Sequence, residues 1–222
     1  MQGKVQRLNF SGSSNIGAFC RVTDHWLLQA ASSESTQRAI ETLFEMQPNI
    51  TTLGGSTLIG ILSAGNVNGL LVPHFTFDEE IEALRSALNC TIVSLESRLT
   101  ALGNLVLTND KAALVSSEFT KEEVQIMQDV LGVEIEVGTV AGSKLVGSFC
   151  TVTNRGLLAH TGVSDSELEH LANLFGVSVD VSTINCGVPY VSIGLLATSH
   201  AAAAGFETTG PELMRISETL FT

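Results

Sequence analysis

One pattern of apolar and polar positions recurs along the chain at a near-constant interval. Each copy has an apolar residue before a glycine, an apolar stretch, a polar turn and a second apolar stretch. The glycines of four copies are Gly17, Gly60, Gly103 and Gly147, at intervals of 43, 43 and 44 residues. A fifth copy, YVSIGLLATSHAAAAG, has Ser192 in the glycine position. A fixed period of this length is typical of repeat architectures, in which neighbouring units share a core.

A helix signal follows each of the last four copies, where Ser or Thr stands three residues before Glu. This spacing forms a capping box, in which the hydroxyl accepts a bond from a free amide of the first turn and the carboxylate reaches back. The four pairs are Thr76–Glu79, Thr120–Glu123, Ser164–Glu167 and Thr209–Glu212. We expect helices over residues 76–88, 118–131, 163–175 and 207–221, and over 34–45 in the first copy, which lacks the box.

An alternating segment follows each of the first four helices, and its period of two predicts a strand. These segments cover residues 50–53, 91–95, 133–140 and 177–184. The expected unit is strand, turn, strand, helix, strand. The fifth copy ends at its helix, so we expect the alternating residues 4–10 to supply its last strand and to close five units into a ring without open edges.

The predicted organisation is a single α/β domain over residues 1–222. Its repeats cover about 15–55, 56–97, 98–143, 144–187 and 188–222, with the strand at 4–10 added to the last.

Charged residues are unevenly distributed between the predicted helices and the rest of the chain. The 222 residues include 23 acidic and 11 basic side chains, a formal charge of −12, which argues against a broad contact with nucleic acid phosphates. The five predicted helices hold 17 of the acids and 4 of the bases. The remaining strands and turns are therefore nearly neutral, and they leave a surface that can approach RNA or protein locally.

The chain has no apolar signal-peptide segment at its start and no apolar stretch long enough to span a membrane, so we expect a soluble, cytoplasmic protein. Cys20, Cys90, Cys150 and Cys186 form no CxxC pair, and the histidines form no HxH or HExxH pattern. We therefore predict no metal and no cofactor.

Catalytic readings of other motifs are weak. Cys20 and Cys150 occupy a position where other copies carry Ser63 and Val106, which indicates a core position. The segment GGSTLIG (54–60) lacks the Lys–Ser/Thr of a phosphate loop and is better explained as a turn. The acidic cluster at residues 78–80 lies at a helix start, where the dipole favours negative charge.

Four strings carry a resemblance to a known family: GNVNGLLVP (65–73), RLTALGN (98–104), TVAGSKLVGSFC (139–150) and TNRGLLAH (153–160). In order and spacing they resemble the translation initiation factor 6 family in its archaeal form, from about Asn15 to Phe221. The resemblance implies the pentein fold, a closed five-bladed α/β propeller with fivefold pseudosymmetry.

The resemblance also implies a function without catalysis. That family binds the intersubunit face of the large ribosomal subunit, beside the sarcin–ricin loop and a neighbouring ribosomal protein, and prevents association with the small subunit. The implied partners are this ribosomal protein and, locally, ribosomal RNA, with no DNA, no membrane and a monomeric state. The resemblance implies that Ile61, Asn104, Ser148 and Phe149 contact the ribosome, and that Asn66, in GNVNG, does so too. Eukaryotic members tend to have a basic residue where this chain has Ile61.

Two alternatives stay open at this point. Other pentein proteins are enzymes that act on guanidino groups with Cys, His and carboxylates, so a hydrolase or transferase using Cys186 is the competing prediction. The predicted turn tips His25, Asn68, Lys111, Arg155 and His200 form a neutral-to-basic circle, which indicates either a binding surface or ordinary polar turns.

Overall fold

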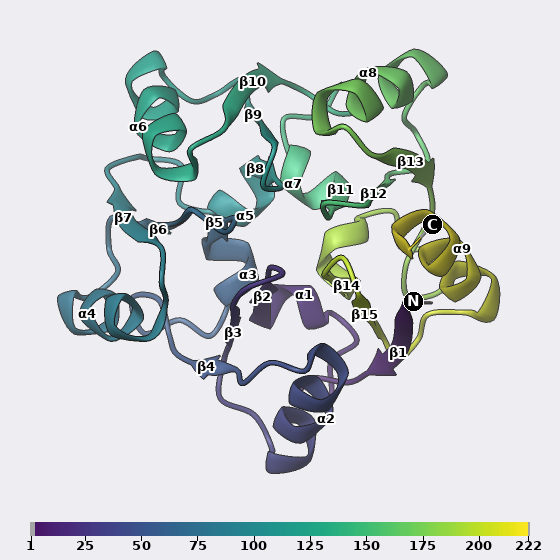
Figure 1. Ribbon diagram of the computed structural model, residues 1–222, viewed down its shortest axis with the longest axis horizontal. Helices are drawn as coiled ribbons and strands as arrows, with labels where there is room; N and C mark the ends of the chain where they lie inside the picture. Colours follow the sequence, from purple (N-terminus) through teal and green to yellow (C-terminus); the bar gives the residue numbers. More distant parts are fainter. Residues whose placement is uncertain (1–2, 222) are drawn as a thin grey trace.

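Five similar units, each with one three-stranded sheet, are arranged around a common centre (Figure 1). The computed structural model describes residues 3–221. In each of the first four units a one-turn helix precedes two antiparallel strands, and a long helix then leads to a third strand that pairs parallel with the second. This is the mixed α/β fold, with a five-fold repeat, that the sequence period predicts.

The first unit consists of α1 (Ile16–Phe19), β2 (Cys20–Val22), β3 (Leu27–Gln29), α2 (Glu34–Phe44) and β4 (Asn49–Ile50). The second consists of α3 (Ile59–Leu62), β5 (Ala64–Gly65), β6 (Gly69–Pro73), α4 (Asp78–Ala87) and β7 (Thr91–Leu95). The third consists of α5 (Leu102–Leu105), β8 (Val106–Thr108), β9 (Ala112–Ser116), α6 (Lys121–Leu131) and β10 (Glu134–Gly138). The fourth consists of α7 (Val146–Phe149), β11 (Cys150–Val152), β12 (Gly156–Ala159), α8 (Asp165–Phe175) and β13 (Ser178–Val181).

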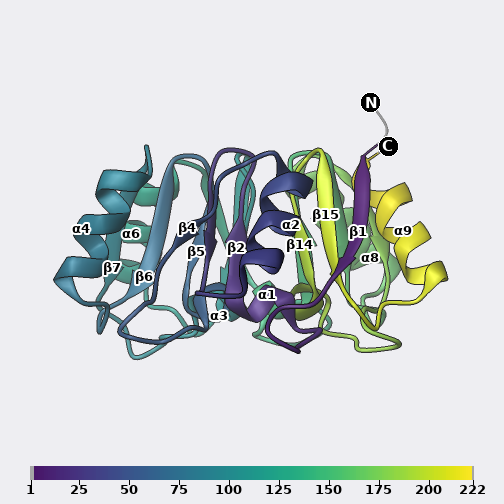
Figure 2. The same ribbon diagram turned by 90° about the horizontal axis from the view of Figure 1, so that it is seen from below.

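The fifth unit is assembled from both ends of the chain. It contains the 3₁₀ helix η1 (Val191–Gly194), β14 (Leu195–Ala197), β15 (Ala201–Gly205) and α9 (Gly210–Phe221). Its third strand is β1 (Lys4–Leu8), which pairs parallel with β15 from Lys4 opposite Ala201 to Leu8 opposite Gly205. Figure 2 shows β1 between β15 and α9. The prediction that the N-terminal segment completes the last unit is confirmed.

The long helices lie on the outside, and each packs between two sheets (Figure 1). Helix α6 contacts β6 and β7 of the preceding unit as well as β10 of its own, and α2 contacts β15 and β1 of the fifth unit. The second strand of each sheet is mostly apolar and buried at every residue. Mostly aliphatic side chains therefore fill the space between units.

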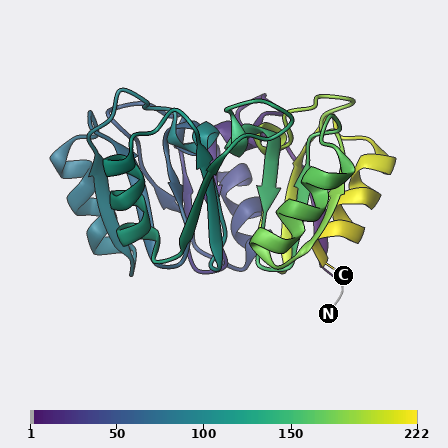
Figure 3. The same ribbon diagram turned by 90° about the horizontal axis from the view of Figure 1, so that it is seen from above.

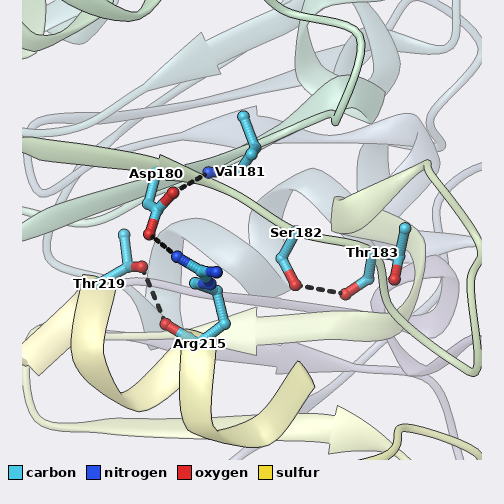
Figure 4. Close-up of polar contacts among 6 residues, drawn as sticks. All are labelled: Asp180, Val181, Ser182, Thr183, Arg215 and Thr219. Atoms are coloured by element: carbon cyan, nitrogen blue, oxygen red, sulfur yellow. Dashed lines mark hydrogen bonds and ion pairs between the residues drawn. The ribbon is translucent and has the colours of Figure 1, made fainter. Parts of the chain in front are cut away.

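Exposed ion pairs join neighbouring units at the outside. Figure 4 shows Arg215 of α9 reaching Asp180 of β13, with 2.6 Å between Nη1 and Oδ2. The same strand-to-helix arrangement pairs Glu136 of β10 with His170 of α8, at 2.7 Å. Such exposed pairs contribute little to stability, about 0–1 kcal/mol each, so packing dominates the contact between units.

The capping boxes at Thr120–Glu123 and Ser164–Glu167 are confirmed by reciprocal hydrogen bonds. The box predicted at Thr76–Glu79 is wrong by one residue. Helix α4 begins at Asp78, and Glu80 accepts a hydrogen bond from the N–H of Phe77 at 3.0 Å. Thr76 instead lies buried, with its N–H donated to the carbonyl of Pro73.

The one-turn helices were not predicted. Each covers only four residues around the repeat glycine, and four residues are too few to show helical periodicity. The predicted first strand of each unit therefore began too early, in residues that form one helical turn.

The molecule has two different ends, seen from the side in Figures 2 and 3. We call the end with α1, α3, α5, α7 and η1, together with the loops beside them, the short-helix face. We call the opposite end, with the turns at residues 23–26, 66–68, 109–111, 153–155 and 198–200, the turn face.

Glutamates at the starts of long helices tie the loops of the short-helix face together. The carboxylate of Glu212 accepts hydrogen bonds from the N–H groups of Thr209 at 2.7 Å and Gly187 at 3.0 Å, and from the hydroxyl of Thr183 at 2.6 Å. Burial alone would raise the pKa of Glu212, but the hydrogen bonds outweigh it and lower the pKa to about 2. Glu80 and Glu167 bind the equivalent loops through Gly54 and Ala141.

We predict that removing residues 1–10 destabilises the whole protein cooperatively, because the deletion exposes the edge of β15 and part of the core around Leu8 and Phe10. Thermal unfolding followed by circular dichroism measures the effect. A chain that lacks only residues 1–2 is the control. An unchanged melting temperature in the longer deletion would contradict the role assigned to β1.

We predict that Glu212→Gln lowers the free energy of unfolding at pH 7 by about 3 kcal/mol, because folding lowers the pKa of this carboxyl from 4.5 to about 2 and one pKa unit corresponds to about 1.4 kcal/mol. The pKa of the carboxyl is lower in the folded chain than its usual 4.5. The difference in free energy of unfolding between wild type and Glu212→Gln is therefore complete at neutral pH and is lost as the pH falls from about 5 towards 2. Urea unfolding across this range measures it, with the exposed Glu169→Gln as control. Parallel pH profiles for wild type and Glu212→Gln would refute the prediction.

Candidate functional site

The one-turn helices contact one another around the centre of the short-helix face. Helix α1 contacts α3, α3 contacts α5, α5 contacts α7, α7 contacts η1, and η1 contacts α1. The repeat glycines make this approach possible, since a Cβ on Gly60 would lie 1.9 Å from the carbonyl oxygen of Gly17. A Cβ on Gly103 would lie 1.9 Å from the oxygen of Gly60, and one on Gly147 would lie 2.3 Å from that of Gly103.

Ser192 takes the glycine position in the fifth unit, as the sequence alignment of the copies predicts. Its hydroxyl donates to the carbonyl of Ser148 at 3.3 Å. Gly17 in turn lies against the carbonyl of Ser192, where a Cβ would come within 1.9 Å. Each unit therefore meets the next through nearly bare backbone.

A central channel of about 270 Å³ lies inside this circle of helices. Ile61, Asn104 and Ser148 line it at the short-helix face, and Asn66, Asn109 and Asp110 line it at the turn face. All five units contribute to its wall.

Four of the five predicted contact residues lie together at the short-helix face. Ile61, Asn104 and Ser148 directly follow a repeat glycine at the channel mouth, where Ser148 is buried and the other two are partly exposed. Phe149 is partly exposed, and its ring stacks on His160 with 4.4 Å between ring centres. Tyr190 meets the same phenyl ring edge-on at 5.4 Å.

Exposed apolar side chains gather at the same end, which we call the apolar rim. Leu58, Leu145 and Tyr190 immediately precede one-turn helices and are 38%, 40% and 45% exposed. Loops at this end add Phe75, Phe77 and Phe206. Exposed aromatic and aliphatic groups in one region are typical of protein-binding surfaces. Leu58, Leu145 and Tyr190 occupy the same position of the repeat, directly before the apolar residue and the glycine or Ser192. The exposure of this repeat position was not predicted from the sequence.

Asn66 lies at the opposite end, on the turn face, and is only 1% exposed. Its side-chain nitrogen donates to the carbonyls of Asn109 at 3.0 Å and Leu131 at 2.9 Å, and its oxygen accepts from the N–H groups of Asn68 and Gly69. It therefore links the second unit to the third and caps the end of α6.

The circle of turn tips also caps helices of neighbouring units. The last carbonyls of a helix have no partner within the helix and carry partial negative charge. Asn68 donates to Leu131, Lys111 to Gly176 at 3.1 Å, and Arg155 to Phe221 at 2.9 Å. Asn68, Lys111 and Arg155 therefore have a structural role as helix caps. The other two tips, His25 and His200, are exposed.

The cysteines offer no catalytic arrangement. Cys20 and Cys150 are buried as predicted for core positions, and burial raises the pKa of both thiols, that of Cys150 to about 12. Cys186 is exposed on a loop outside the channel wall, and its N–H donates to Glu212. Within residues 3–221 no histidine bonds to Cys186, so the general base that a nucleophilic thiol needs is missing there.

Neither a metal centre nor a membrane-spanning helix is built from residues 3–221. No group of three or more His, Cys, Asp or Glu side chains there is placed to hold a metal ion. No helix in that range has the length and apolar character needed to cross a membrane.

Comparison with known proteins gives relatives along nearly the whole chain. The eIF-6 family profile matches residues 5–219. Translation initiation factor 6 of Pyrococcus abyssi is 43% identical over 97% of this chain and 98% of its own. The protein of the same name from Saccharolobus islandicus is 38% identical over 97% and 98%. Eukaryotic translation initiation factor 6 of Saccharomyces cerevisiae is 39% identical over 97% of this chain and 89% of its own.

The match extends from β1 into α9 and so includes all five units, the apolar rim and the channel. The prediction of a guanidino-group enzyme has neither the site geometry nor the relatives to support it. The chain belongs to the eIF-6 family of translation initiation factors, which are not enzymes.

Proposed function

We propose that this translation factor binds the intersubunit face of the large ribosomal subunit and sterically prevents the small subunit from joining. The observation that carries the proposal is the apolar rim, which lies at the same end of the molecule as the channel mouth and contributes Leu145 and Tyr190 to the channel wall. The names of its relatives support a role in translation. Ile61, Asn104, Ser148 and Phe149 lie inside or beside the rim and are the proposed contacts.

The chemistry of the short-helix face fits a protein partner better than a long stretch of RNA. Aromatic and aliphatic anchors are the side chains that contribute most at protein interfaces. The acidic side chains are concentrated on the outer helices, where they repel phosphates around the perimeter. The proposed partner is accordingly the ribosomal protein beside the sarcin–ricin loop, with local contact to ribosomal RNA.

The buried position of Asn66 leaves it outside this surface. All four of its side-chain hydrogen bonds are made within the chain. We propose for it a supporting role, in which it holds the second and third units together.

We also propose that the five units form a closed five-bladed propeller of the pentein type, a single monomeric, cytoplasmic domain over residues 1–222. The contacts from η1 back to α1 and the pairing of β1 with β15 support closure. Each sheet takes all three of its strands from this chain, so none needs a strand from a partner subunit.

Co-sedimentation with purified ribosomal subunits tests the function directly. We expect the protein to sediment with large subunits and not with small subunits. In a light-scattering assay it should reduce the association of the two subunits in proportion to large subunits occupied. Binding without any effect on association would contradict the steric mechanism, and equal binding to both subunits would contradict the proposed partner.

We predict that Asn104→Arg weakens binding to the large subunit about tenfold or more, because a long cation at the channel mouth would hold a closely packed partner away. Asn104 is partly exposed, so the melting temperature should change little. Asn173→Arg makes the same chemical change on the outer surface of α8 and should bind normally. Undiminished binding by Asn104→Arg would refute the assignment of this face.

A further inference from the structure

Arg21 lies in the wall of the central channel, at a position where the other units carry apolar residues or a threonine. The equivalent residues are Ala64, Leu107, Thr151 and Leu196. The side chain of Arg21 reaches from the first unit to the second, where its Nη2 donates to the carbonyls of Gly60 at 2.7 Å and Ser63 at 2.6 Å. A guanidinium group is therefore held in place inside the molecule.

Most of the hydrogen-bonding capacity of this guanidinium is unused. An arginine has five N–H donors, and the two bonds of Nη2 are the ones that Arg21 makes to protein. Its Nε is buried without a partner. Across residues 3–221 no carboxylate forms an ion pair with it. A partly buried cation that has no counter-charge is unfavourable, and burial lowers the pKa of Arg21 to about 10.

A second unused polar group lies in the same wall. Thr151 belongs to β11 of the fourth unit, and its hydroxyl oxygen is buried without a partner. The first and fourth units are not neighbours around the centre, so Arg21 and Thr151 approach the channel from separate parts of its wall. Leu107 and Leu196 complete the wall at this level.

Carboxylates restrict where a charged ligand could lie. Asp24 and Asp110 line the channel at the turn face, where the amide of Asn154 donates to both, at 3.0 and 2.6 Å, and Ser199 donates to Asp24. An anion is repelled at that end, whereas a guanidino or ammonium compound is repelled by Arg21. The volume of about 270 Å³ exceeds that of several water molecules, each of which takes about 30 Å³ in the liquid.

We propose that the central channel binds a small oxyanion, a phosphate or a carboxylate, with Arg21 as the principal donor and the hydroxyl of Thr151 as a second. The ligand supplies the counter-charge that the protein does not provide and bridges two units that have no direct sheet pairing. Arg21 and Thr151 lie on the strands β2 and β11, beyond the one-turn helices that carry the proposed ribosome contacts at the mouth of the same channel.

Titration of the purified full-length chain with inorganic phosphate and, separately, with acetate tests this site at constant ionic strength, with chloride as the reference anion. A ligand that binds only the folded chain raises the melting temperature by mass action. We expect a saturable rise, and amide chemical-shift changes that are concentrated at β2 and β11. A response to phosphate alone identifies a phosphate site, and a response to acetate identifies a carboxylate site. No saturable response to either anion would overturn the proposal.

Arg21→Gln should abolish the saturable response, and Thr151→Val should weaken the affinity about tenfold, as expected from loss of a hydrogen bond to a charged ligand. Arg38→Gln removes the same charge from the exposed surface of α2 and should leave the titration unchanged. If Arg21→Gln does not fold, Thr151→Val, which keeps the shape of the side chain, decides the question. A wild-type response in the folded Arg21→Gln protein, or in Thr151→Val, would refute the site.

Discussion

The packing of a glycine against the carbonyl oxygen of the preceding glycine sets the distance between units. With a Cβ at these positions the contact would shrink to about 2 Å, well inside van der Waals separation. Because the one-turn helices approach so closely, the first strand of each sheet is drawn to the centre and the long helices are placed outside. The channel, the apolar rim and the outer acidic surface all follow from that arrangement. Ser192 is the exception, and there the chain forms a 3₁₀ helix instead of an α-turn.

The two ends of the molecule have different chemistry because the helices run in one direction. Their carboxyl ends lie at the turn face, where unpaired carbonyls need donors, and polar side chains of the preceding unit supply them. Their amino ends lie at the short-helix face, where glutamates such as Glu212 bind the loop amides from within. The polar groups of both ends are thus largely satisfied internally. Apolar side chains remain exposed at the short-helix face, which suits it to a protein partner.

Local patterns in the sequence were enough for the main elements but not for contacts between units. The period, the capping boxes and the alternating segments predicted the five long helices, the strand at residues 91–95 and the pairing of the N-terminal segment. The one-turn helices are too short for periodicity, and the cap of α4 moved to Phe77. The buried position of Asn66 could not be predicted, because a polar turn residue and a cap for a helix 65 positions away are indistinguishable along the chain. The position of Arg21 in the channel wall could not be predicted, because its contacts with Gly60 and Ser63 join residues about 40 positions apart in the sequence.

The pairing of β1 with β15 means that the fold can be completed only after nearly the whole chain has been synthesised. The ribosome makes Lys4–Leu8 first and Ala201–Gly205 nearly last, so the N-terminal strand stays without its partner for most of translation. The circle of one-turn helices, which needs η1 beside α1, is likewise incomplete until then. The short-helix face is therefore complete only after nearly the whole chain has been synthesised, so this translation factor cannot present that face while it is still being made.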